Sequence, residues 1–502
     1  MNDAGPRSGR SWAPRFPILI VFALGLALRL IALGSRGIWY DDAFSIFLAR
    51  NSFEDIVSGT AADTMPPLYY FLLHLWMVFG QGVVWLRMLN VALSMGILWL
   101  VYLLAGRFLG RKTAFWATTL TAVSPLQIYH AQELRMYALL AFSLLGYTFF
   151  FLKLLREPHQ GRSAWRSWAG LVVFAAIAMY THNLAVFTLL VPNIYLLLRR
   201  KLRFLGQLCL ADLAILLLAS PWLVILPGQI AKIQAAFWTP RPGLLEVVQA
   251  IMAMHTNLPV PSAILPVSLA SSLLAVALVG FEVLRSRPAP QPIAALATLA
   301  IAPALLLFVV SYGMRPVFVP RALMLSSLAY TVLAAWVVAE RPAPRLVRGL
   351  LLTLFLVPAA LVLPSQYLYE DFPRSPFREL TEELTQVVSP DDLVLHDNKL
   401  SFFPAYYYAP TLNQSFLPDE TGSHNDTLAA ATQEAMGIYP ALSIAAATAG
   451  ENRVWYIVFE ETLTEYSELG YAVHPNLLWL RQELDQGRTL QVGDLLAYEF
   501  RR

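Results

Sequence analysis

Residues 39–48 have the sequence Trp-Tyr-Asp-Asp-Ala-Phe-Ser-Ile-Phe-Leu, which places two adjacent carboxylates, Asp41 and Asp42, just past the first hydrophobic stretch. Residues 1–363 hold only 12 of the 33 Asp and Glu residues of the chain, so a pair of neighbouring acids is unusual there. Carboxylates at a bilayer edge are costly. The pair is therefore a candidate for chemistry, although Asp also favours helix N-termini and the pair could simply cap the amphipathic stretch that follows.

The composition is that of an integral membrane protein. The chain has 502 residues, of which 57% are hydrophobic and 14% charged, against roughly 25% charged in a soluble domain. Residues 1–363 carry 28 Lys and Arg against 12 Asp and Glu, whereas residues 364–502 carry 8 against 21. This division predicts a membrane module over 1–363 and a separate domain over 364–502. The single cysteine, Cys209, excludes an intrachain disulfide.

Eleven apolar stretches are candidates to cross the bilayer, which takes about 20 residues each. They are residues 16–34, 83–105, 113–130, 134–152, 166–181, 183–198, 205–226, 263–284, 293–312, 321–339 and 346–363. A twelfth run, 67–80, is short, and all basic clusters fall on one side only if it does not cross. We therefore expect it to lie in the membrane interface, with the N-terminus cytoplasmic and the C-terminal domain outside the cell membrane.

The C-terminal domain has the pattern of a small α/β unit. Helical spacing extends over 377–388, and short apolar runs at 393–396 and 454–459 have strand composition. Residues 428–436 and 477–484 are candidates for two further helices. The fold class is thus mainly α, a polytopic helical bundle followed by this α/β domain.

Acidic, basic and histidine side chains from distant segments converge on the predicted outer face. The first outer loop, about 35–82, contains the Asp pair, and Glu133, His182 and Arg321 belong to later outer segments. A carboxylate there can take a proton from a hydroxyl, and an arginine can bind a phosphate through two parallel hydrogen bonds. The arrangement predicts group transfer from a lipid phosphate to a hydroxyl acceptor.

The motifs in these loops resemble those of the GT-C superfamily of membrane glycosyltransferases. The match is closest to the bacterial relatives of protein O-mannosyltransferase and of the aminoarabinose lipid A transferase. The segment 39–45 is similar to their W-x-D-E-A-x-S motif, 66–76 to P-P-L-Y-Y-x-L-x-H-x-W, and 132–137 to R-E-A-R-x-Y. Two positions depart from the pattern: Asp42 stands where Glu is usual, and Gln132 where Arg is frequent.

The resemblance implies an inverting transfer of a sugar from a polyprenyl-phosphate donor to a hydroxyl acceptor on the outer side of the membrane. It implies Asp41 as the general base, with Asp42 and Glu133 as further catalytic acids. The implied substrate-binding residues are Arg29, Tyr69, His74, Arg87, Arg135, Tyr137, His182 and Arg321. No cofactor and no metal are predicted to be required, although the acids could hold a divalent cation. The expected partners are the lipid donor, the acceptor and membrane lipid, not nucleic acid.

Other interpretations remain open. A transporter or flippase of a lipid-linked substrate is the main alternative, and a scaffold that presents the acidic domain is another. Histidines such as His74 and His182 are more often packing residues, and Arg29 could extend along the bilayer toward water. The sugar, the acceptor, the carrier lipid and the oligomeric state are not determined by these residues.

Overall fold

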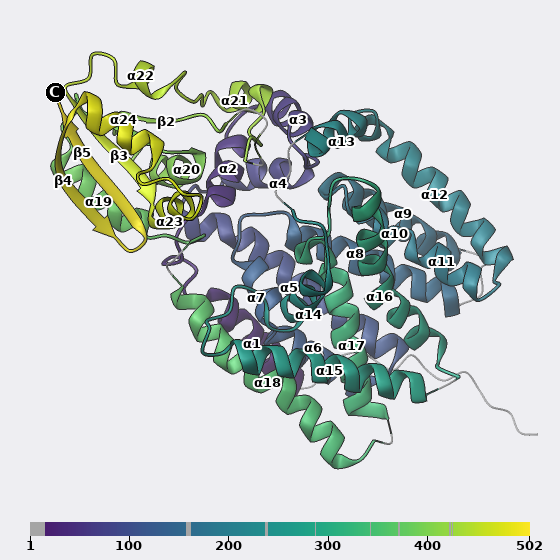
Figure 1. Ribbon diagram of the computed structural model, residues 1–502. Helices are drawn as coiled ribbons and strands as arrows, with labels where there is room; N and C mark the ends of the chain where they lie inside the picture. Colours follow the sequence, from purple (N-terminus) through teal and green to yellow (C-terminus); the bar gives the residue numbers. More distant parts are fainter. Residues whose placement is uncertain are drawn as a thin grey trace, which may run out of the picture.

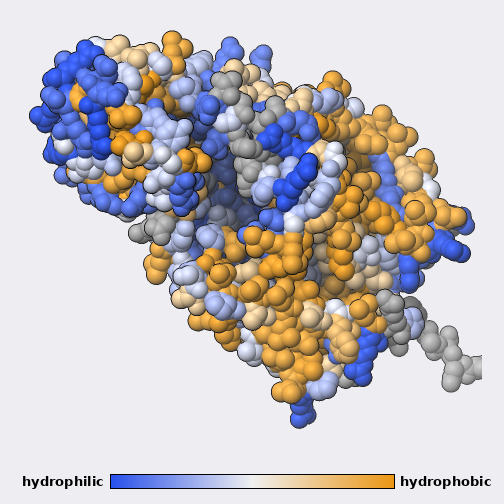
Figure 2. Space-filling view, viewed as in Figure 1, coloured by the Kyte–Doolittle hydropathy of each residue, from blue (hydrophilic) through white to orange (hydrophobic). Residues whose placement is uncertain are grey.

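The chain folds into a large helical body with a small α/β domain at one end (Figure 1). The computed structural model describes residues 16–502 apart from 157–161, 236–238, 287, 342, 370–371, 421–422 and 424. Apolar residues cover much of the visible surface of the helical body, whereas the α/β domain is largely polar, and a hollow separates the two (Figure 2). This distribution fits a body embedded in lipid and a domain in water.

The helical body contains α1 to α18 and one 3-10 helix. Their bounds are α1 Phe16–Leu30, α2 Tyr40–Ala49, α3 Phe53–Ala62, α4 Leu68–Met77, α5 Val83–Phe108, α6 Arg111–Ala122, α7 Pro125–Ala131, α8 Tyr137–Arg156, α9 Arg162–Thr181, α10 Ala185–Leu189, α11 Val191–Leu198, α12 Leu202–Leu223, α13 Leu226–Ala235, α14 Leu244–Thr256, α15 Leu265–Arg285, α16 Gln291–Gly313, η1 Pro320–Leu323, α17 Met324–Glu340 and α18 Arg345–Leu368.

Seven helices among the described residues are long and apolar enough to cross a membrane: α5, α8, α12, α15, α16, η1 with α17, and α18. The protein is therefore a multi-pass membrane protein. The helix α4 covers ten residues of the run 67–80, which is too short to cross a bilayer core of about 30 Å at 1.5 Å per residue. The total of eleven spans and the sidedness of the termini stay predictions. The helix α18 continues through the expected domain boundary at 364, and the division itself also stays a prediction.

One of the expected spans is broken in the structure, and the prediction of a single helix there was wrong. The stretch 113–130 divides into α6 and α7, because Pro125 has no N–H to continue the helical ladder. The stretch 183–198 is covered by α10 and α11, which continue through Leu190 as one apolar helix, Ala185–Leu198. The helix α14, Leu244–Thr256, was not predicted at all.

Prolines inside the long helices leave carbonyl groups that need other donors, because no water reaches them in lipid. In α18, Pro358 cannot donate to the Leu354 carbonyl, and the ring Nε2 of His255 lies 2.8 Å from that oxygen. In α16, the hydroxyl of Ser326 donates to the Leu299 carbonyl at 3.1 Å, four residues before an internal proline. Side chains of α14 and α17 therefore complete the backbone hydrogen bonding of the helices beside them.

The α/β domain is built on a five-stranded sheet of order β2-β1-β3-β5-β4. Strand β1 pairs in parallel with β2 and β3, and β5 pairs antiparallel with β3 and β4. The strands are β1 Leu393–His396, β2 Gln414–Phe416, β3 Arg453–Phe459, β4 Asp485–Val492 and β5 Leu495–Arg501. The helices are α19 Phe377–Val387, α20 Lys399–Tyr408, α21 Ala430–Met436, α22 Ile444–Ala447, α23 Glu460–Glu468 and α24 Pro475–Glu483.

The structure confirms the two predicted strands and three predicted helices of this domain to within two residues at each end. Sequence reasoning missed β2, β4 and β5, and the helices α20, α22 and α23. Strand β4 is mostly exposed, so it lacks the apolar alternation that marks a half-buried strand.

The α/β domain packs directly on the first loop of the helical body. Helix α21 lies against α3, where a Cβ on Gly59 would come within 3.1 Å of the Ala435 side chain, so glycine allows the close approach. The Thr432 hydroxyl donates to the Gly59 carbonyl at 2.9 Å. The Ile38 N–H donates to the Tyr408 hydroxyl at 2.9 Å. These contacts fix the domain beside the residues that carry the Asp pair.

Candidate active site

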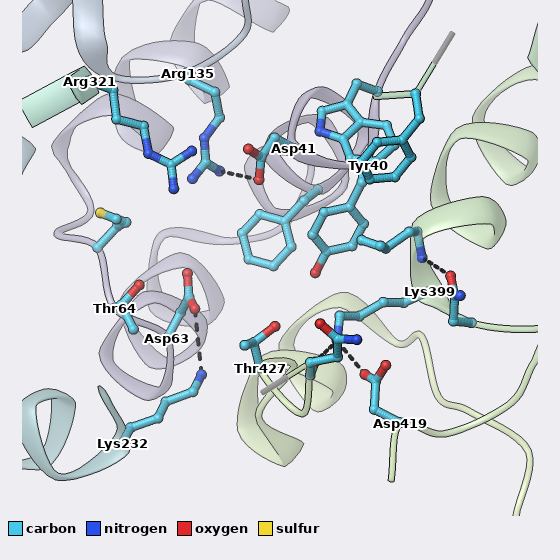
Figure 3. A pocket seen from close by; sticks show the side chains of 17 residues that line it. Tyr40, Asp41, Asp63, Thr64, Arg135, Lys232, Arg321, Lys399, Asp419 and Thr427 are labelled. Atoms are coloured by element: carbon cyan, nitrogen blue, oxygen red, sulfur yellow. Dashed lines mark hydrogen bonds and ion pairs between the residues drawn. The ribbon is translucent and has the colours of Figure 1, made fainter. Parts of the chain in front are cut away.

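A cavity of about 400 Å³ lies where the helical body and the α/β domain meet (Figure 3). Its lining comes from the start of α2, the segment after α3, the segment before α8, α13, η1 and the residues around the start of α20. The lining residues are Trp39, Tyr40, Asp41, Phe44, Asp63, Thr64, Met65, Arg135, Lys232, Arg321, Phe372, Asn398, Lys399, Leu400, Asp419, Asn425 and Thr427. Segments far apart in sequence thus form one polar site with an aromatic side.

The two adjacent aspartates lie in different environments. Both belong to the first turn of α2, where neighbouring side chains point about 100° apart. The Asp41 side chain is 24% exposed and faces the cavity, with Oδ1 3.7 Å from Arg135 Nη1. The Asp42 side chain is 2% exposed, and its Oδ2 lies 3.1 Å from Arg87 Nη2. Only the first carboxylate of the pair is open to a ligand.

Arg87 lies fully buried behind the cavity and does not line it. Its Nη1 donates to the carbonyls of Leu33 at 2.8 Å and Arg36 at 2.7 Å, and its Nη2 donates to that of Gly37 at 3.0 Å. Together with the ion pair to Asp42, these bonds fix the chain that enters α2. Arg87 therefore positions the Asp pair, and its side chain offers no surface to a substrate.

Glu133 is buried behind the same wall. Its carboxylate Oε2 lies 2.8 Å from Nδ1 of His130. Burial opposes ionisation, but His130, followed by Arg36 and Arg135, outweighs it and lowers the pKa of Glu133 to about 2. The residue is an ionised carboxylate that does not line the cavity. The Leu134 N–H, next in the chain, donates to Asp42 Oδ1 at 2.7 Å.

Two predicted arginines, Arg135 and Arg321, do line the cavity, and both point toward it in Figure 3. The guanidinium carbon of Arg321 lies 5.7 Å from the centroid of the Tyr137 ring, which is buried. Behind them lies His182, whose Nδ1 accepts from the Leu184 N–H at 3.1 Å. Burial, then the charges of Arg321 and Arg135, lower the pKa of His182 to about 3, so it is neutral at pH 7.

The other predicted binding residues do not line the cavity. Arg29 donates to Ser94 Oγ at 2.7 Å and to the Ala122 carbonyl at 3.0 Å, so it caps the broken end of α6. Nδ1 of His74 lies 2.9 Å from the Ala49 carbonyl, which joins α4 to the end of α2. Tyr69 is fully buried. Their roles as binding residues remain untested predictions.

Sequence reasoning missed four of the seven charged residues that line the cavity. Asp63 lies 3.5 Å from Lys232, and Lys399 forms an ion pair with Asp419. With Asp41–Arg135 these make three ion pairs around one cavity, which we call the cavity pairs. The one available signal was that Asp63 lies just before the Pro-Pro motif of the first loop. Nothing in the sequence indicates that the α/β domain contributes a wall.

Within the part of the chain that the structure describes, no group of three or more His, Cys, Asp or Glu side chains could hold a metal ion. The cavity carboxylates Asp41, Asp63 and Asp419 are each paired with a basic side chain. That no metal is required stays a prediction.

Comparison with solved structures shows that the fold is shared along almost the whole chain. The apo crystal structure of ArnT from Cupriavidus metallidurans matches with a TM-score of 0.65 at 14% identity, covering 96% of this chain and 97% of that one. The structure of ArnT from Cupriavidus metallidurans bound to undecaprenyl phosphate matches with a TM-score of 0.63 at 14% identity, over the same shares of both chains. An oligosaccharyltransferase of Archaeoglobus fulgidus matches with a TM-score of 0.55 at 11% identity, covering 96% of this chain and 73% of that one.

At the level of sequence, no curated protein matches the chain significantly. The overall fold is similar to that of ArnT, and the polar site lies where the helical body meets the α/β domain. Residues 64–225 match the family model described as dolichyl-phosphate-mannose-protein mannosyltransferase, so this part of the chain is similar to that family. The match confirms the resemblance that the loop motifs indicated.

Proposed function

We propose that this protein moves a sugar from a polyprenyl-phosphate donor to a hydroxyl acceptor on the outer side of the cell membrane, with Asp41 as the general base. The observation that carries the proposal is the division of the Asp pair. The two carboxylate oxygens of Asp42 accept hydrogen bonds from Arg87 and from the Leu134 N–H, whereas Asp41 faces the cavity beside Arg135. The solved relative that binds undecaprenyl phosphate supports the choice of donor.

Arg135 and Arg321 are the proposed phosphate ligands. Both line the cavity, and a guanidinium matches two phosphate oxygens at once. His182 adds support from behind: because its Nδ1 accepts a backbone hydrogen bond, its Nε2 carries the proton, and no described residue accepts that proton. When the phosphate binds, Arg135 is shared between it and Asp41.

The proposed step is a direct displacement. The acceptor oxygen forms a bond to the anomeric carbon while Asp41 takes the proton of that hydroxyl. The bond from the anomeric carbon to the phosphate oxygen breaks, and its electron pair leaves with the polyprenyl phosphate. Arg135 and Arg321 stabilise the added negative charge. Attack from the face opposite the leaving group inverts the anomeric configuration, and Asp41 returns its proton to water through the cavity.

In this proposal Asp42 and Glu133 are positioning residues. Asp42 joins α2 to the segment 133–135 through the Leu134 N–H, and Glu133 anchors that segment to α7 through His130. Each holds Arg135 at a fixed distance from Asp41 without contact to the cavity.

The test is the substitution Asp41→Asn in the full-length protein, reconstituted in nanodiscs with polyprenyl-phosphate sugars extracted from host membranes. Loss of the base predicts a fall in transfer of about 10²- to 10⁴-fold, with an unchanged thermal unfolding midpoint. Asp63→Asn is the matched control, since that acid lines the same cavity but pairs with Lys232. Mass spectrometry of the product measures transfer.

Transfer at the wild-type rate by Asp41→Asn would contradict the proposal. The flippase alternative is tested on the same preparation in proteoliposomes. Lipid translocation without a glycosidic product, unaffected by Asp41→Asn, would favour transport.

A further inference from the structure

We infer that the α/β domain supplies the acceptor-binding wall of the cavity and that the acceptor is a saccharide. This inference rests on the proposed function and specifies its second substrate. Seven of the cavity residues belong to the part of the chain after residue 364: Phe372, Asn398, Lys399, Leu400, Asp419, Asn425 and Thr427. The side chains of Lys399, Asp419 and Thr427 are labelled in Figure 3.

The topology of the sheet places this wall. Strand β1 is the central parallel strand, with β2 on one side and β3 on the other. In such sheets the carboxyl end beside the strand-order reversal is where ligands bind. The chain leaves β1 at His396 and enters α20 through Asn398, whose side chain caps the helix by accepting from the Leu400 N–H at 2.9 Å. The binding edge of the domain therefore opens onto the membrane cavity.

Lys399 is held in the wall rather than extended into water. Its side chain is 3% exposed, and its ammonium group donates to the Asp419 carboxylate and to the Asn425 carbonyl. Asp419 keeps its second oxygen, Oδ1, without a hydrogen bond to any described residue. The Thr427 hydroxyl likewise makes no hydrogen bond within the described part of the chain. Both groups are available to a ligand in the cavity.

The chemistry of the lining fits a sugar ring. A carboxylate oxygen, a hydroxyl and amide groups offer acceptors and donors side by side, and each sugar hydroxyl both donates and accepts. Aromatic side chains form the adjoining surface: Trp39, Tyr40, Phe44 and Phe372. Their faces can pack on the C–H face of a sugar, as apolar surfaces do in ligand pockets with few polar groups.

The same lining does not fit a peptide acceptor. One common way to bind an extended peptide is to add it as a strand to a sheet edge, with pockets for alternate side chains. No residue of a strand lines the cavity; its α/β-domain wall consists of loop residues and the first turn of α20. The wall therefore offers side-chain polar groups and no sheet edge for that mode of binding.

The experiment uses the full-length protein in nanodiscs with polyprenyl-phosphate sugars from host membranes as donor. Two acceptor probes compete: oligosaccharides released from the host envelope, and synthetic Ser/Thr peptides. We expect the sugar on the oligosaccharide. In Thr427→Val and in Asp419→Asn we expect KM for the oligosaccharide to rise about tenfold, as loss of a hydrogen bond to the ligand predicts. Thr411→Val, an exposed position in the same domain, is the control.

A second readout distinguishes a loss of acceptor binding from a loss of folding and from damage to the donor site. Cleavage of the donor by water, without acceptor, is expected to be unchanged in the control Thr411→Val, and the KM for the donor is expected to stay at the wild-type value in Thr427→Val and Asp419→Asn. Transfer to the peptide hydroxyl, or an unchanged KM in both variants, would overturn the inference while leaving the proposed function standing. If the wild type cleaves no donor with either probe or with water, it is the proposed function that fails.

Discussion

The charges beneath the cavity and those around it differ in how completely the protein satisfies them. We call Arg29, Arg87, Asp42 and Glu133 the buried network. Each of these residues is buried, and each is hydrogen-bonded to backbone or to another titratable side chain. The cavity pairs Asp41–Arg135 and Asp63–Lys232 are longer, at 3.7 and 3.5 Å, and all of these side chains except that of Arg135 are partly exposed.

The difference distinguishes residues that stabilise the fold from residues that can bind a substrate. A buried charge is stable only when it is paired or hydrogen-bonded within the protein, and each charge of the buried network has such partners. The cavity pairs Asp41–Arg135 and Asp63–Lys232 have longer contacts, and Asp41, Asp63 and Lys232 are partly exposed. Asp41 and Asp42 show the contrast one residue apart. A predicted site residue whose charged group is buried and bonded within the protein is therefore better assigned to the scaffold. The following predictions test that assignment.

The largest effect is expected for Arg87→Met. The substitution leaves Asp42 buried without its cation and three carbonyls without their donor. Breaking a buried pair by removing one partner costs about 3–5 kcal/mol. We expect the free energy of unfolding in detergent to fall by that amount, measured by tryptophan fluorescence in denaturant. A loss as small as that of Asp41→Asn would show that Arg87 is not part of the scaffold.

A smaller effect is expected for Glu133 and depends on pH. Its folded pKa of about 2 lies below the ordinary value of 4.5, so its ionised form stabilises the fold above pH 4.5. That stabilisation is lost as the pH falls from 4.5 toward 2. Glu133→Gln removes it, on the order of 3 kcal/mol near neutral pH. Unfolding curves at several pH values should converge for wild type and variant at low pH; parallel curves would contradict the assignment.

The smallest effect on stability is expected for Asp63→Asn. Both partners of its ion pair are about one-fifth exposed, and pairs in contact with water contribute about 0–1 kcal/mol. We expect the unfolding midpoint to stay close to that of the wild type. A loss comparable to that of Arg87→Met would place Asp63 in the buried network and erase the distinction between the two regions.

Local patterns in the sequence predicted many of the helices and two of the strands. Apolar runs of membrane length identified the long helices, and short apolar runs of strand composition identified β1 and β3. Prediction from local patterns failed where proline breaks an apolar run, as at Pro125. The apolar character of a run does not show where the hydrogen bonds of the helix end. The loop motifs located the wall that contains Asp41, Arg135 and Arg321. They did not distinguish these residues from Asp42 and Arg87.

By itself, the sequence determined the class of protein, a helical membrane body with a polar α/β domain, and the presence of an acid pair at the end of the first hydrophobic stretch. These follow from composition and from periodicity over a few residues. The tertiary structure alone decided which aspartate faces the cavity, that Lys399 and Asp419 complete it, and that Arg29 caps a broken helix. Those outcomes depend on contacts between residues up to several hundred positions apart, and no local pattern records which distant side chain will satisfy a buried charge.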